Sequence, residues 1–576
     1  MSSLTSSLWS PNTVDAARIA VIRDKTGLSE IGAAILAGRW AEDEIPDSWF
    51  NPDVSVLHDP FAMLNMAAAV DRLKYALKAK NKIRIITDYD VDGTTSSLIL
   101  QAALRLMSSD LDLDYHIPNR FHEGYGFSVI AAEKAAEDKV DLIVTADIGV
   151  RDFEAVESAR RAGIDVLICD HHLPSGASVP QDAIVLCPPQ DGCSYPNSAL
   201  AACGVSLKLA TALLSNHQKW DQILLSLLKL GAIGTVADLV SLKTPENRAI
   251  VSIGLEGLNQ PRHHPGLEAL LDIAGSSPGG IRTSDLGFRI GPRINAAGRV
   301  ADAKLVVRLL NSREPAEAKE LAAELNRQND SRRTIQKQVE VEANEQVGDP
   351  PDPFIVVCKS EEEGWHRGVV GIVASRLKDD FHRPAAVIAI QGDTAVGSVR
   401  SISRIHAIEA LDSCEDLLVR YGGHPAAAGF TIPTRHIDEF RRRLGEFVTS
   451  HTTEQDLVRT RKYDVQVDPQ SLGDDLFAEL TRMGPFGMGN PTPYLMIPKV
   501  RPMAVRAIGK DRTHLKLRIP RQSGNPIDAL WWGRADLVDL MKTSEVDLLG
   551  QLGENIYQGR RTLQFEIKDA RVSSDG

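Results

Sequence analysis

The chain has 576 residues, of which 43% are hydrophobic, 25% charged and 5% aromatic, a composition typical of an ordered globular protein with several domains. Its 65 Lys and Arg against 77 Asp and Glu give a net charge of −12, so a nucleic-acid role would require a local basic surface or bound cations. The six cysteines include no Cys-x-x-Cys pair, and neither a secretion signal nor an apolar run of roughly 18–20 residues is present, so we expect a cytoplasmic protein and no membrane span.

Residues 1–78 and 79–255 differ in the spacing of their apolar side chains. Residues 1–78 predict a helical leader, with apolar residues at helical spacing in 26–41 and 60–79. Residues 79–255 alternate helical stretches with short β-rich runs, and the expected strands cover 83–87, 113–117, 142–145, 166–169 and 184–187. Because strands separated by helices usually pair in parallel, this part predicts an α/β domain with a parallel sheet.

The remaining chain predicts three further parts. Residues 256–349 are mostly helical and end in 314–347, which we expect to form a rigid connector helix. Pro350, Pro351 and Pro353 interrupt it, and residues 350–455 again alternate strands, at 354–358 and 385–390, with a helix at 368–378. Short β runs between turns in 456–576 favour a small β-barrel. The predicted fold class is therefore multi-domain α/β, with a connector helix and a C-terminal barrel.

A loop rich in carboxylates follows the first expected strand. Asp88, Asp90 and Asp92 occupy alternate positions and Gly93 follows them, at the sheet edge where open α/β folds bind ligands. An EF-hand loop begins with a similar pattern, but it requires a preceding helix and a glutamate where this chain has Ile99. The sequence therefore favours a ligand site at the sheet edge over a calcium-binding helix pair.

Two more expected strands also end in acidic residues. The run 142–146 leads into Asp147, and 166–169 leads into Asp170, His171 and His172. Taken alone, Asp170 is equally well explained as a cap or a turn residue. Three such strand ends in one sheet would gather their side chains, and crowded carboxylates require cations. A mixed set of carboxylates and imidazoles suits Mn²⁺ or Mg²⁺.

Further motifs accompany these loops in order along the chain. They are Gly234-Thr235-Val236-Ala237-Asp238, the stretches Gly291 to Arg299 and Gly368 to Arg376, Gly397-Ser398 with Arg400-Ser401, and Gly422-Gly423-His424. Together with Asp170-His171-His172, they resemble the RecJ branch of the DHH phosphoesterase superfamily, over about residues 51–569. The likeness implies a DHH catalytic domain at 79–255, a helical connector at 256–349, a DHHA1 substrate-binding domain at 350–455 and a nucleic-acid-binding OB-fold at 456–576.

The resemblance also implies roles for the acidic loops. The implied ligands of two Mn²⁺ or Mg²⁺ ions are Asp90, Asp92, Asp147 as the bridge, His171 and Asp238, with Asp88 completing the first site and His172 facing the scissile phosphate. For Asp238 the residues alone favour a helix cap. The chain departs from the family pattern at Ile148 and at the Ala202-Cys203 turn, where we expect altered loop geometry but the same ligands.

Substrate contacts are expected first in a glycine-rich stretch and in the second α/β domain. Arg289, Arg293 and Arg299, with Asn295 among them, would line a phosphate path, although surface salt bridges are the ordinary alternative for such arginines. The resemblance adds three further DNA contacts, Arg120, Arg400 and His424, of which the last two would contact the phosphate of the terminal nucleotide.

The C-terminal part contains the clearest basic cluster of the sequence. Residues 499–521 contain eight Lys and Arg and one acidic residue, Asp511, and we expect Lys516 and Arg518 to bind DNA there. His514 and Tyr557 are candidate rings for base stacking, although both could instead belong to the core.

The resemblance implies a metal-dependent exonuclease that removes mononucleotides from the 5′ end of single-stranded DNA, in repair and recombination. It also implies a monomer, with single-strand-binding protein and a RecQ-type helicase as partners. One alternative is a DHH phosphodiesterase for short oligonucleotides or cyclic dinucleotides, which would not need the connector and the basic barrel. The other is a non-catalytic nucleic-acid-binding scaffold, which would be expected to have lost metal ligands that this chain retains.

Overall fold

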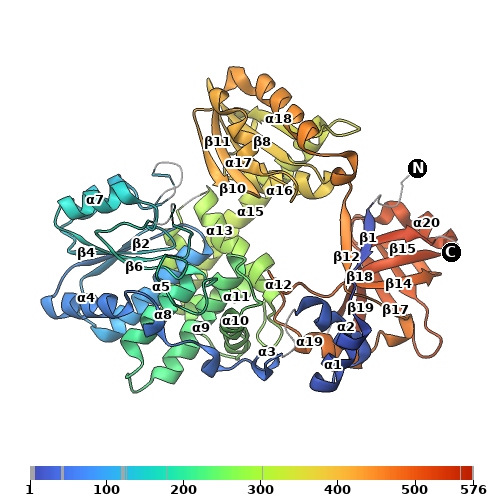
Figure 1. Cartoon of the computed structure of the whole chain (residues 1–576), viewed down its shortest axis with the longest axis horizontal. Helices are drawn as coiled ribbons and strands as arrows, with labels where there is room; N and C mark the ends of the chain where they lie inside the picture. The colour runs from blue at the N-terminus through green and yellow to red at the C-terminus, as the bar shows by residue number, and fades with distance from the viewer. Residues whose placement is uncertain are drawn as a thin grey trace. The chain divides into compact units, whose positions relative to one another are not determined.

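The computed structural model describes residues 7–40, 45–118, 123–124, 126–174, 176, 178–300, 302–557 and 560–573 (Figure 1). The contacts between residues divide the chain into two compact units. One comprises Asp47–Gln338 with Pro485–Asn490, and the other comprises Met1–Pro46, Val339–Gly484 and Pro491–Gly576.

The unit that begins at Asp47 contains a five-stranded parallel sheet. Its strands are β2 (Ile83–Thr87), β3 (Leu113–His116), β4 (Leu142–Ala146), β5 (Asp165–Cys169) and β6 (Ile184–Leu186), in the order β3-β2-β4-β5-β6. All five residues of β2 and of β4 are buried, as expected for parallel strands covered on both faces. The predicted parallel sheet is therefore confirmed, with strand limits within about one residue of the sequence pattern.

Helices cover both faces of this sheet. The first face carries α4 (Met66–Ala79), α5 (Val91–Met107) and α8 (Ala202–Leu214), which pack on Ile85, Val144 and Leu167. The opposite face carries α6 (Val129–Glu137) and α7 (Phe153–Arg161), which pack on Ile86 and Ile143. Figure 1 shows α4 and α7 on opposite sides of the strands. The carboxyl ends of β2, β4 and β5 therefore meet at one edge of a rigid layer.

The rest of this unit is helical, as predicted. It contains α3 (Asp47–Phe50), α9 (Trp220–Ala237), α10 (Pro245–Leu258), α11 (Pro265–Ala274), α12 (Thr283–Asp285), a π-helical turn η3 (Leu286–Ile290), α13 (Gly291–Val300), α14 (Lys304–Asn311) and the start of α15 (Pro315–Gln346). By length and composition α9 alone, among the described helices, could cross a membrane. Its buried residues, including Leu228 and Ile233, belong to the hydrophobic core, so α9 is a core helix.

The second unit has two short helices near its amino-terminal end; the second falls within the predicted helical run 26–41, and the first precedes that run within the predicted leader. Helix α1 (Ala16–Thr26) ends at Gly27, whose φ of 67° is left-handed, and α2 (Glu30–Arg39) starts after Ser29, which caps it. The strand β1 (Leu8–Pro11) precedes them and pairs in parallel with β12 (Thr460–Tyr463). The amino-terminal segment is therefore fixed to a strand more than 400 residues later.

A mixed five-stranded sheet forms the first layer of this unit. It consists of β7 (Ile355–Ser360), β8 (Ala385–Gln391), β9 (Thr394–Arg400), β10 (Arg420–His424) and β11 (Ala427–Pro433), in the order β10-β11-β9-β8-β7. The same region contains three helices, α16 (Val370–Phe381), α17 (Ala407–Asp412) and α18 (Ile437–His451). The buried Trp365 donates its Nε1–H to Glu342 near the end of α15, over 2.7 Å, so Trp365 is a core residue.

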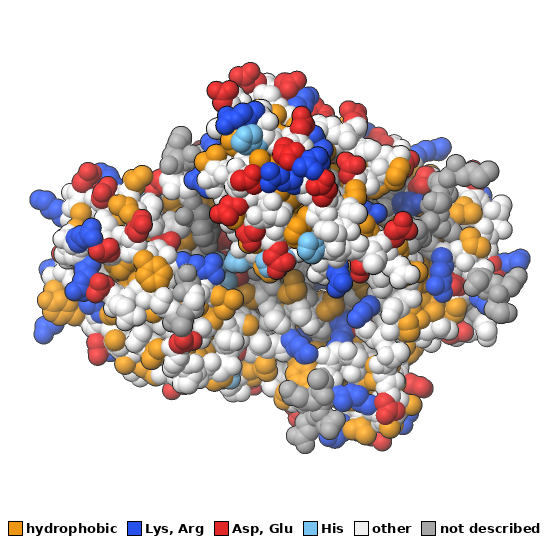
Figure 2. Space-filling view, turned by 45° about the horizontal axis from the view of Figure 1, so that its top comes forward, with side chains coloured by type: hydrophobic (Ala, Val, Ile, Leu, Met, Phe, Trp, Pro, Cys, Tyr) orange, Lys and Arg blue, Asp and Glu red, His pale blue; other side chains and the backbone are white. Residues whose placement is uncertain are grey.

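The C-terminal part is a seven-stranded sheet in the order β13-β14-β18-β19-β17-β16-β15. Its strands are β13 (Val465–Gln466), β14 (Leu495–Val500), β15 (Met503–Ile508), β16 (His514–Ile519), β17 (Ile527–Trp531), β18 (Val546–Tyr557) and β19 (Arg560–Val572), with the helices α19 (Asp474–Arg482) and α20 (Val538–Thr543). The predicted predominance of short β runs in this part is confirmed, and two helices accompany them. Figure 2 shows acidic and basic side chains interspersed over the face in view, so the net charge of −12 does not form one acidic field there.

Candidate metal centre

The loop after β2 turns sharply and places three carboxylates at the sheet edge. Asp90 caps α5 by accepting the N–H of Gly93 over 3.0 Å, and Asp92 lies buried in the first turn of that helix. A Cβ atom on Gly93 would lie 2.4 Å from the carbonyl oxygen of Asp88, so only glycine permits the loop to fold back this closely. The order strand, loop and helix N-terminus thus fixes Asp88, Asp90 and Asp92 together.

The start of α8 holds Asp92 by two backbone hydrogen bonds. The N–H of Ala202 donates to Asp92 Oδ2 over 2.7 Å, and the N–H of Cys203 donates to Oδ1 over 2.8 Å. A carboxylate at a helix N-terminus is stabilised by the N–H groups and by the helix dipole. The residues that replace glycines in this turn therefore still present their N–H groups to the acidic loop.

Asp147 follows β4 in an unusual backbone conformation. Its φ of 65° is left-handed, which is uncommon for a residue other than glycine and is often found at functional sites. The next residue, Ile148, is buried in the core on the α6–α7 face of the sheet, and its carbonyl accepts the hydroxyl of Thr145 over 2.8 Å. Ile148 therefore fills the core beside the site.

Asp170 organises both histidines that follow it. Its Oδ1 accepts the N–H of His171 over 2.7 Å, the N–H of His172 over 3.1 Å and Nδ1 of His172 over 2.8 Å. Its Oδ2 accepts the N–H of Val150 over 3.0 Å. Sequence reasoning placed Asp170 in the cluster but gave it no role. The signal was present, since a strand-end aspartate directly before two histidines can accept from their backbone N–H groups.

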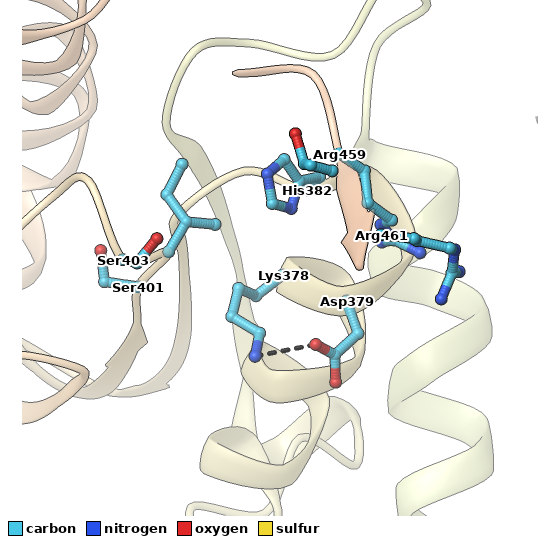
Figure 3. Close-up of a pocket in the computed structure, with 9 residues that line it drawn as sticks. Lys378, Asp379, His382, Ser401, Ser403, Arg459 and Arg461 are labelled. Carbon is cyan, nitrogen blue, oxygen red and sulfur yellow. Dashed lines mark ion pairs between the residues drawn. The ribbon is translucent and has the colours of Figure 1, made fainter. Parts of the chain in front are cut away.

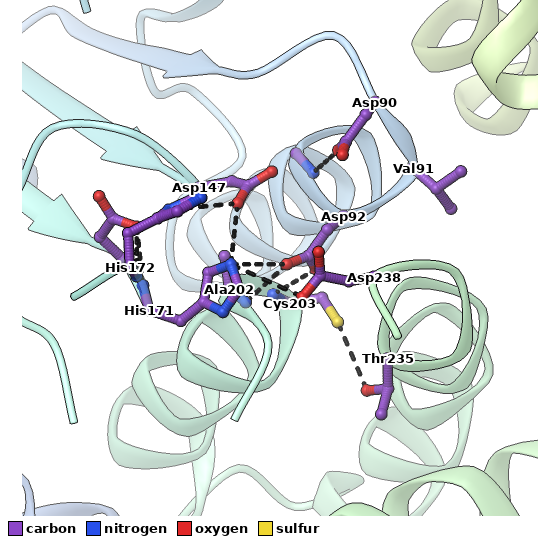
Figure 4. A network of polar contacts seen from close by, with 12 residues as sticks. Asp90, Val91, Asp92, Asp147, His171, His172, Ala202, Cys203, Thr235 and Asp238 are labelled. Carbon is purple, nitrogen blue, oxygen red and sulfur yellow. Dashed lines mark hydrogen bonds and ion pairs between the residues drawn. The ribbon is translucent and has the colours of Figure 1, made fainter. Parts of the chain in front are cut away.

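The imidazole of His171 lies among three carboxylates (Figure 4). Its Nε2 is 3.3 Å from Asp147, 3.7 Å from Asp238 and 3.9 Å from Asp92. This nitrogen is buried and has no hydrogen-bond partner among the described residues. A buried ring nitrogen surrounded by carboxylate oxygens, without a hydrogen bond, is arranged as a metal ligand would be.

Three groups of side chains have ligand atoms close enough to share an ion. They are Asp88 with Asp90 and Asp147, Asp147 with His171 and His172, and Asp92 with His171 and Asp238, and within each group the atoms lie within 4.8 Å of one another. Asp147 and His171 each belong to two groups. Asp238 joins them from the end of α9, where Leu239 has a left-handed φ of 61°. The structure thus brings all seven predicted residues together.

The electrostatics of the cluster favour added positive charge. Burial, followed by the charges of Asp90 and Asp92, raises the pKa of Asp147 well above its ordinary value. Burial and the same two neighbours raise the pKa of Asp238 to about 9. Burial lowers the pKa of His171 and so favours the neutral imidazole that binds metals. Divalent cations would remove the repulsion that shifts the carboxyl groups.

Asp170 and His172 behave as an ion pair at the rim of this cluster. Burial tends to raise the pKa of Asp170, but its hydrogen bond to His172 and the charge of that ring lower it to about 2. Burial tends to lower the pKa of His172, but the hydrogen bond and the charge of Asp170 raise it. His172 is therefore held closer to its protonated form than His171.

Comparisons with known proteins agree with the motifs. Family models of the DHH family N-terminal domain, the DHHA1 domain and the RecJ OB domain match residues 82–235, 352–450 and 463–569. The single-stranded-DNA-specific exonuclease RecJ of Bacillus subtilis (strain 168) is 35% identical over 571 residues, which cover 98% of this chain and 71% of that protein. The chain belongs to the RecJ family.

Two more RecJ proteins support the assignment. The single-stranded-DNA-specific exonuclease RecJ of Dickeya dadantii (strain 3937) is 35% identical over 525 residues, covering 87% of this chain and 89% of that protein. The crystal structure of RecJ from Thermus thermophilus in complex with Mn²⁺ matches with a TM-score of 0.83 at 29% identity, covering 99% of this chain and 80% of that one. The predicted fold class, with its C-terminal OB domain, is confirmed.

In this RecJ chain, α13 carries predicted DNA-binding residues next to the metal loop. A Cβ atom on Gly298 would lie 2.9 Å from the carbonyl oxygen of Tyr89, so the helix packs directly on that loop. Asn295 shares the helix face of Gly291 and Gly298, and Arg299 follows one turn later. The glycines thus allow a helix bearing polar side chains to approach the site.

Arg289 and Arg293 lie before and within the same helix. Arg289 lies 3.2 Å from Asp285, and it is more than half exposed. Arg293 donates to Asn326 over 3.2 Å and to the carbonyl oxygen of Arg289 over 2.7 Å. Arg289 therefore forms a surface salt bridge, which was the alternative to a phosphate contact. The predicted DNA contact Arg120 lies outside the described residues.

Arg400 and His424 occupy one row of the DHHA1 sheet. Arg400 of β9 pairs with Ala427 of β11, which pairs in turn with His424 of β10, so the two side chains share one face, two strands apart. Arg400 donates to the hydroxyl of Ser398 over 3.3 Å and to a backbone carbonyl, and burial lowers the pKa of its guanidinium. No carboxylate in the described part of the chain forms an ion pair with it.

On the OB domain, the basic cluster is less basic than the sequence suggested. Lys516 lies 2.7 Å and Arg518 lies 3.1 Å from the same carboxylate, Asp528, on the neighbouring strand β17. Sequence reasoning also missed Trp532, which is 55% exposed and contacts His514 edge to face with ring centroids 4.8 Å apart. The side chain of Tyr557 lies outside the described residues. Trp532 and His514 are therefore the rings that the structure offers for base stacking.

Proposed function

We propose that this RecJ chain is a metal-dependent exonuclease that hydrolyses single-stranded DNA from its 5′ end to mononucleotides. The observation that carries the proposal is the convergence of Asp147 and His171 with carboxylates from three other segments at one sheet edge. Its curated relatives are named single-stranded-DNA-specific exonucleases, which supports the substrate class. The 5′ to 3′ direction and a role in repair and recombination belong to this proposal.

The donor set fits two Mn²⁺ or Mg²⁺ ions. Asp88 and Asp90 would hold one ion, Asp92, His171 and Asp238 would hold the other, and Asp147 would bridge them. Carboxylate and imidazole ligands suit both metals, and His171 Nε2 is buried without a hydrogen-bond partner among the described residues. When bound, such a pair of ions lowers the pKa of a shared water and stabilises the charge that develops on a phosphoryl group.

The chain's own residues position these groups and the substrate. Backbone N–H groups of α8 hold Asp92, so its carboxylate does not have to reorganise when a substrate arrives. Asp170 orients His172 and favours its protonated form, which would contact an oxygen of the scissile phosphate. Asn295 and Arg299 on α13 would contact the strand beside the metal loop.

The DHHA1 and OB domains supply the remaining proposed contacts. Arg400 and His424 would bind the phosphate of the terminal nucleotide, because they share one face and Arg400 has no carboxylate partner in the described chain. Lys516 and Arg518, with Trp532, would hold the strand on the OB domain. The proposal also includes the domain limits 1–78, 79–255, 256–349, 350–455 and 456–576. It further includes a cytoplasmic location, a monomeric state, and single-strand-binding protein and a RecQ-type helicase as partners.

The decisive experiment removes the proposed bridge. Asp147→Ala should abolish hydrolysis of end-labelled single strands in Mn²⁺ while strand binding remains measurable, because the DNA-binding side chains named above are intact. Asp165→Ala is a matched control, since it removes an exposed aspartate that pairs with Arg72 at the opposite end of the neighbouring strand. Nuclease activity retained by Asp147→Ala would refute the bridging role. Faster turnover of dinucleotides than of long strands would instead favour the small-substrate phosphodiesterase.

A further inference from the structure

A hollow lined by basic side chains lies in the unit that contains the DHHA1 and OB domains. Its volume is about 460 Å³, and it is formed by the end of α16, the loop after β9 and the segment that enters β12 (Figure 3). Lys378, His382 and the one acidic lining residue, Asp379, come from α16 and its C-cap, and Arg459 and Arg461 come from the β12 segment. None of these residues belongs to the proposed metal centre or to the DNA contacts named above.

Both arginines belong to the start of the β12 segment. Arg459 directly precedes β12 and Arg461 lies within it, and both line the hollow, as does Thr460 between them. The pairing of β1 with β12, with Trp9 opposite Arg461, fixes this segment along one edge. The two arginines are thus part of a fixed wall of the hollow.

The positive charges of the hollow are only partly compensated. Lys378 lies 2.7 Å from Asp379, which is largely exposed, and Arg461 Nε lies 3.2 Å from the buried Asp569. This Nε is itself buried, so the donors that Arg461 can offer to a bound anion are those of its two terminal nitrogens. Arg459 forms no side-chain ion pair or hydrogen bond within the described chain. Two guanidinium groups therefore retain donors that a bound anion could use.

The electrostatic shifts agree with this geometry. Burial, followed by the charges of Arg459, Arg383 and Lys378, lowers the pKa of His382. Burial and the charge of Arg461 lower the pKa of Arg459, and the nearby Asp379 and Asp380 offset this only in part. Cations that are partly desolvated and repel one another are stabilised when an anion joins them.

We propose that this hollow binds a phosphate group of the single strand, as a second anchoring point separate from the metal centre. Guanidinium groups donate in the forked geometry that phosphate oxygens accept, and the exposed Ser403 adds a hydroxyl at the rim. The hollow lies where β12 connects the DHHA1 region to the OB region, so a strand held on the OB domain has a phosphate contact on the way to the DHHA1 sheet. This inference rests on the proposed action on DNA.

The test compares Arg459→Gln with Arg435→Gln in the full chain. Arg435 is an exposed arginine of the DHHA1 region with no ion pair or side-chain hydrogen bond in the described structure, so its removal controls for the loss of one positive charge. Arg459→Gln removes a charge that has no carboxylate partner, so both variants should fold, and thermal unfolding checks this. Binding of oligo(dT) is measured by fluorescence anisotropy in EDTA, at several salt concentrations.

We expect Arg459→Gln alone to weaken binding several-fold and to reduce the slope of log affinity against log salt by about 0.7, the value for one phosphate contact on a single strand. Equal slopes for the two variants and the unaltered chain would overturn the inference. A second arm measures thermal stabilisation by inorganic phosphate and by a 5′-mononucleotide. If these ligands stabilise the unaltered chain but not Arg459→Gln, and the slope is unchanged, the hollow binds free phosphate compounds and the assignment to the strand is wrong. Neither arm requires hydrolysis, so failure of the nuclease proposal is detected separately, by Asp147→Ala.

Discussion

The hydrogen bonds of Asp170 allow a quantitative prediction about catalysis. In Asp170→Asn, the amide oxygen can replace Oδ1 and keep the three contacts to His171 and His172, but the amide nitrogen then faces the N–H of Val150, 3.0 Å away. The opposite amide orientation places the nitrogen against three donors instead. In either orientation the negative charge beside His172 is lost.

The expected loss follows from the charge-assisted bond to His172. Such a bond is worth about 1.5–3 kcal/mol, which corresponds to about 10–150-fold in rate if it acts fully in the transition state. We expect kcat for single-strand hydrolysis in Mn²⁺ to fall within this range, with all proposed metal ligands present. Because Asp170 raises the pKa of His172, the alkaline limb of the pH–rate profile should also move to lower pH.

The matched control is Asp152→Asn. Asp152 also accepts a backbone N–H, that of Phe127 over 2.7 Å, but it forms no hydrogen bond with either histidine in the described structure. Because Asp152 and His172 interact only through their charges, its substitution should move the pH–rate profile less than Asp170→Asn does. The reasoning about Asp170 is refuted if Asp170→Asn hydrolyses DNA within twofold of the unaltered chain, or if both variants shift the profile equally.

Three further predictions concern the anchoring residues and the metals. Replacing Lys516 and Arg518 by Glu should weaken strand binding and flatten its salt dependence, because Asp528 neutralises only one of the two charges. An unchanged salt slope would show that Lys516 and Arg518 do not bind the strand. Arg400→Gln should raise KM about tenfold for strands with a 5′-phosphate but not for strands with a 5′-hydroxyl, whereas an equal effect on both would exclude a terminal-phosphate contact. Binding of Mn²⁺ to the metal-free protein should release protons, because the raised pKa of Asp238 keeps that carboxyl protonated, and the Mn²⁺ affinity should increase as the pH rises towards about 9. Calorimetry in buffers of different ionisation enthalpy measures the proton release. If no protons are released, this assignment is wrong.

The parallel sheet and its acidic edge could be predicted because both depend on local patterns. The apolar run of β2 lies next in sequence to Asp88 and Gly93, and β5 leads directly into Asp170. In a parallel sheet the carboxyl ends of neighbouring strands meet at one edge, so the position of each aspartate in its strand determines its place in space. The convergence of most candidate ligands therefore followed from acidic residues at the ends of the predicted strands.

Other features depend on tertiary contacts that sequence spacing does not encode. Asp238 ends a helix, where the residues alone favour a cap, and only the fold brings its carboxylate to His171. Asp528 lies on the strand that follows Lys516, and the β16–β17 register, which pairs Asp528 with Arg518, places its carboxylate beside both basic side chains. Helix α1 lies before the predicted run 26–41 and ends at a single left-handed glycine, Gly27.

The metal centre combines several unfavourable arrangements that have one common explanation. Asp147 adopts a left-handed backbone, burial and neighbouring carboxylates raise the pKa values of Asp90, Asp147 and Asp238, and His171 Nε2 lacks a hydrogen bond in the described structure. Each arrangement costs stability in the metal-free chain, and the raised carboxyl pKa values make that cost grow as the pH rises from the ordinary aspartate range through the folded-state values. A pair of divalent cations offsets the carboxylate repulsion and engages the imidazole nitrogen at the same time. The same packing that destabilises the metal-free loops therefore preorganises the ligands. We expect the removal of any one ligand to change both the metal affinity and the stability of the fold.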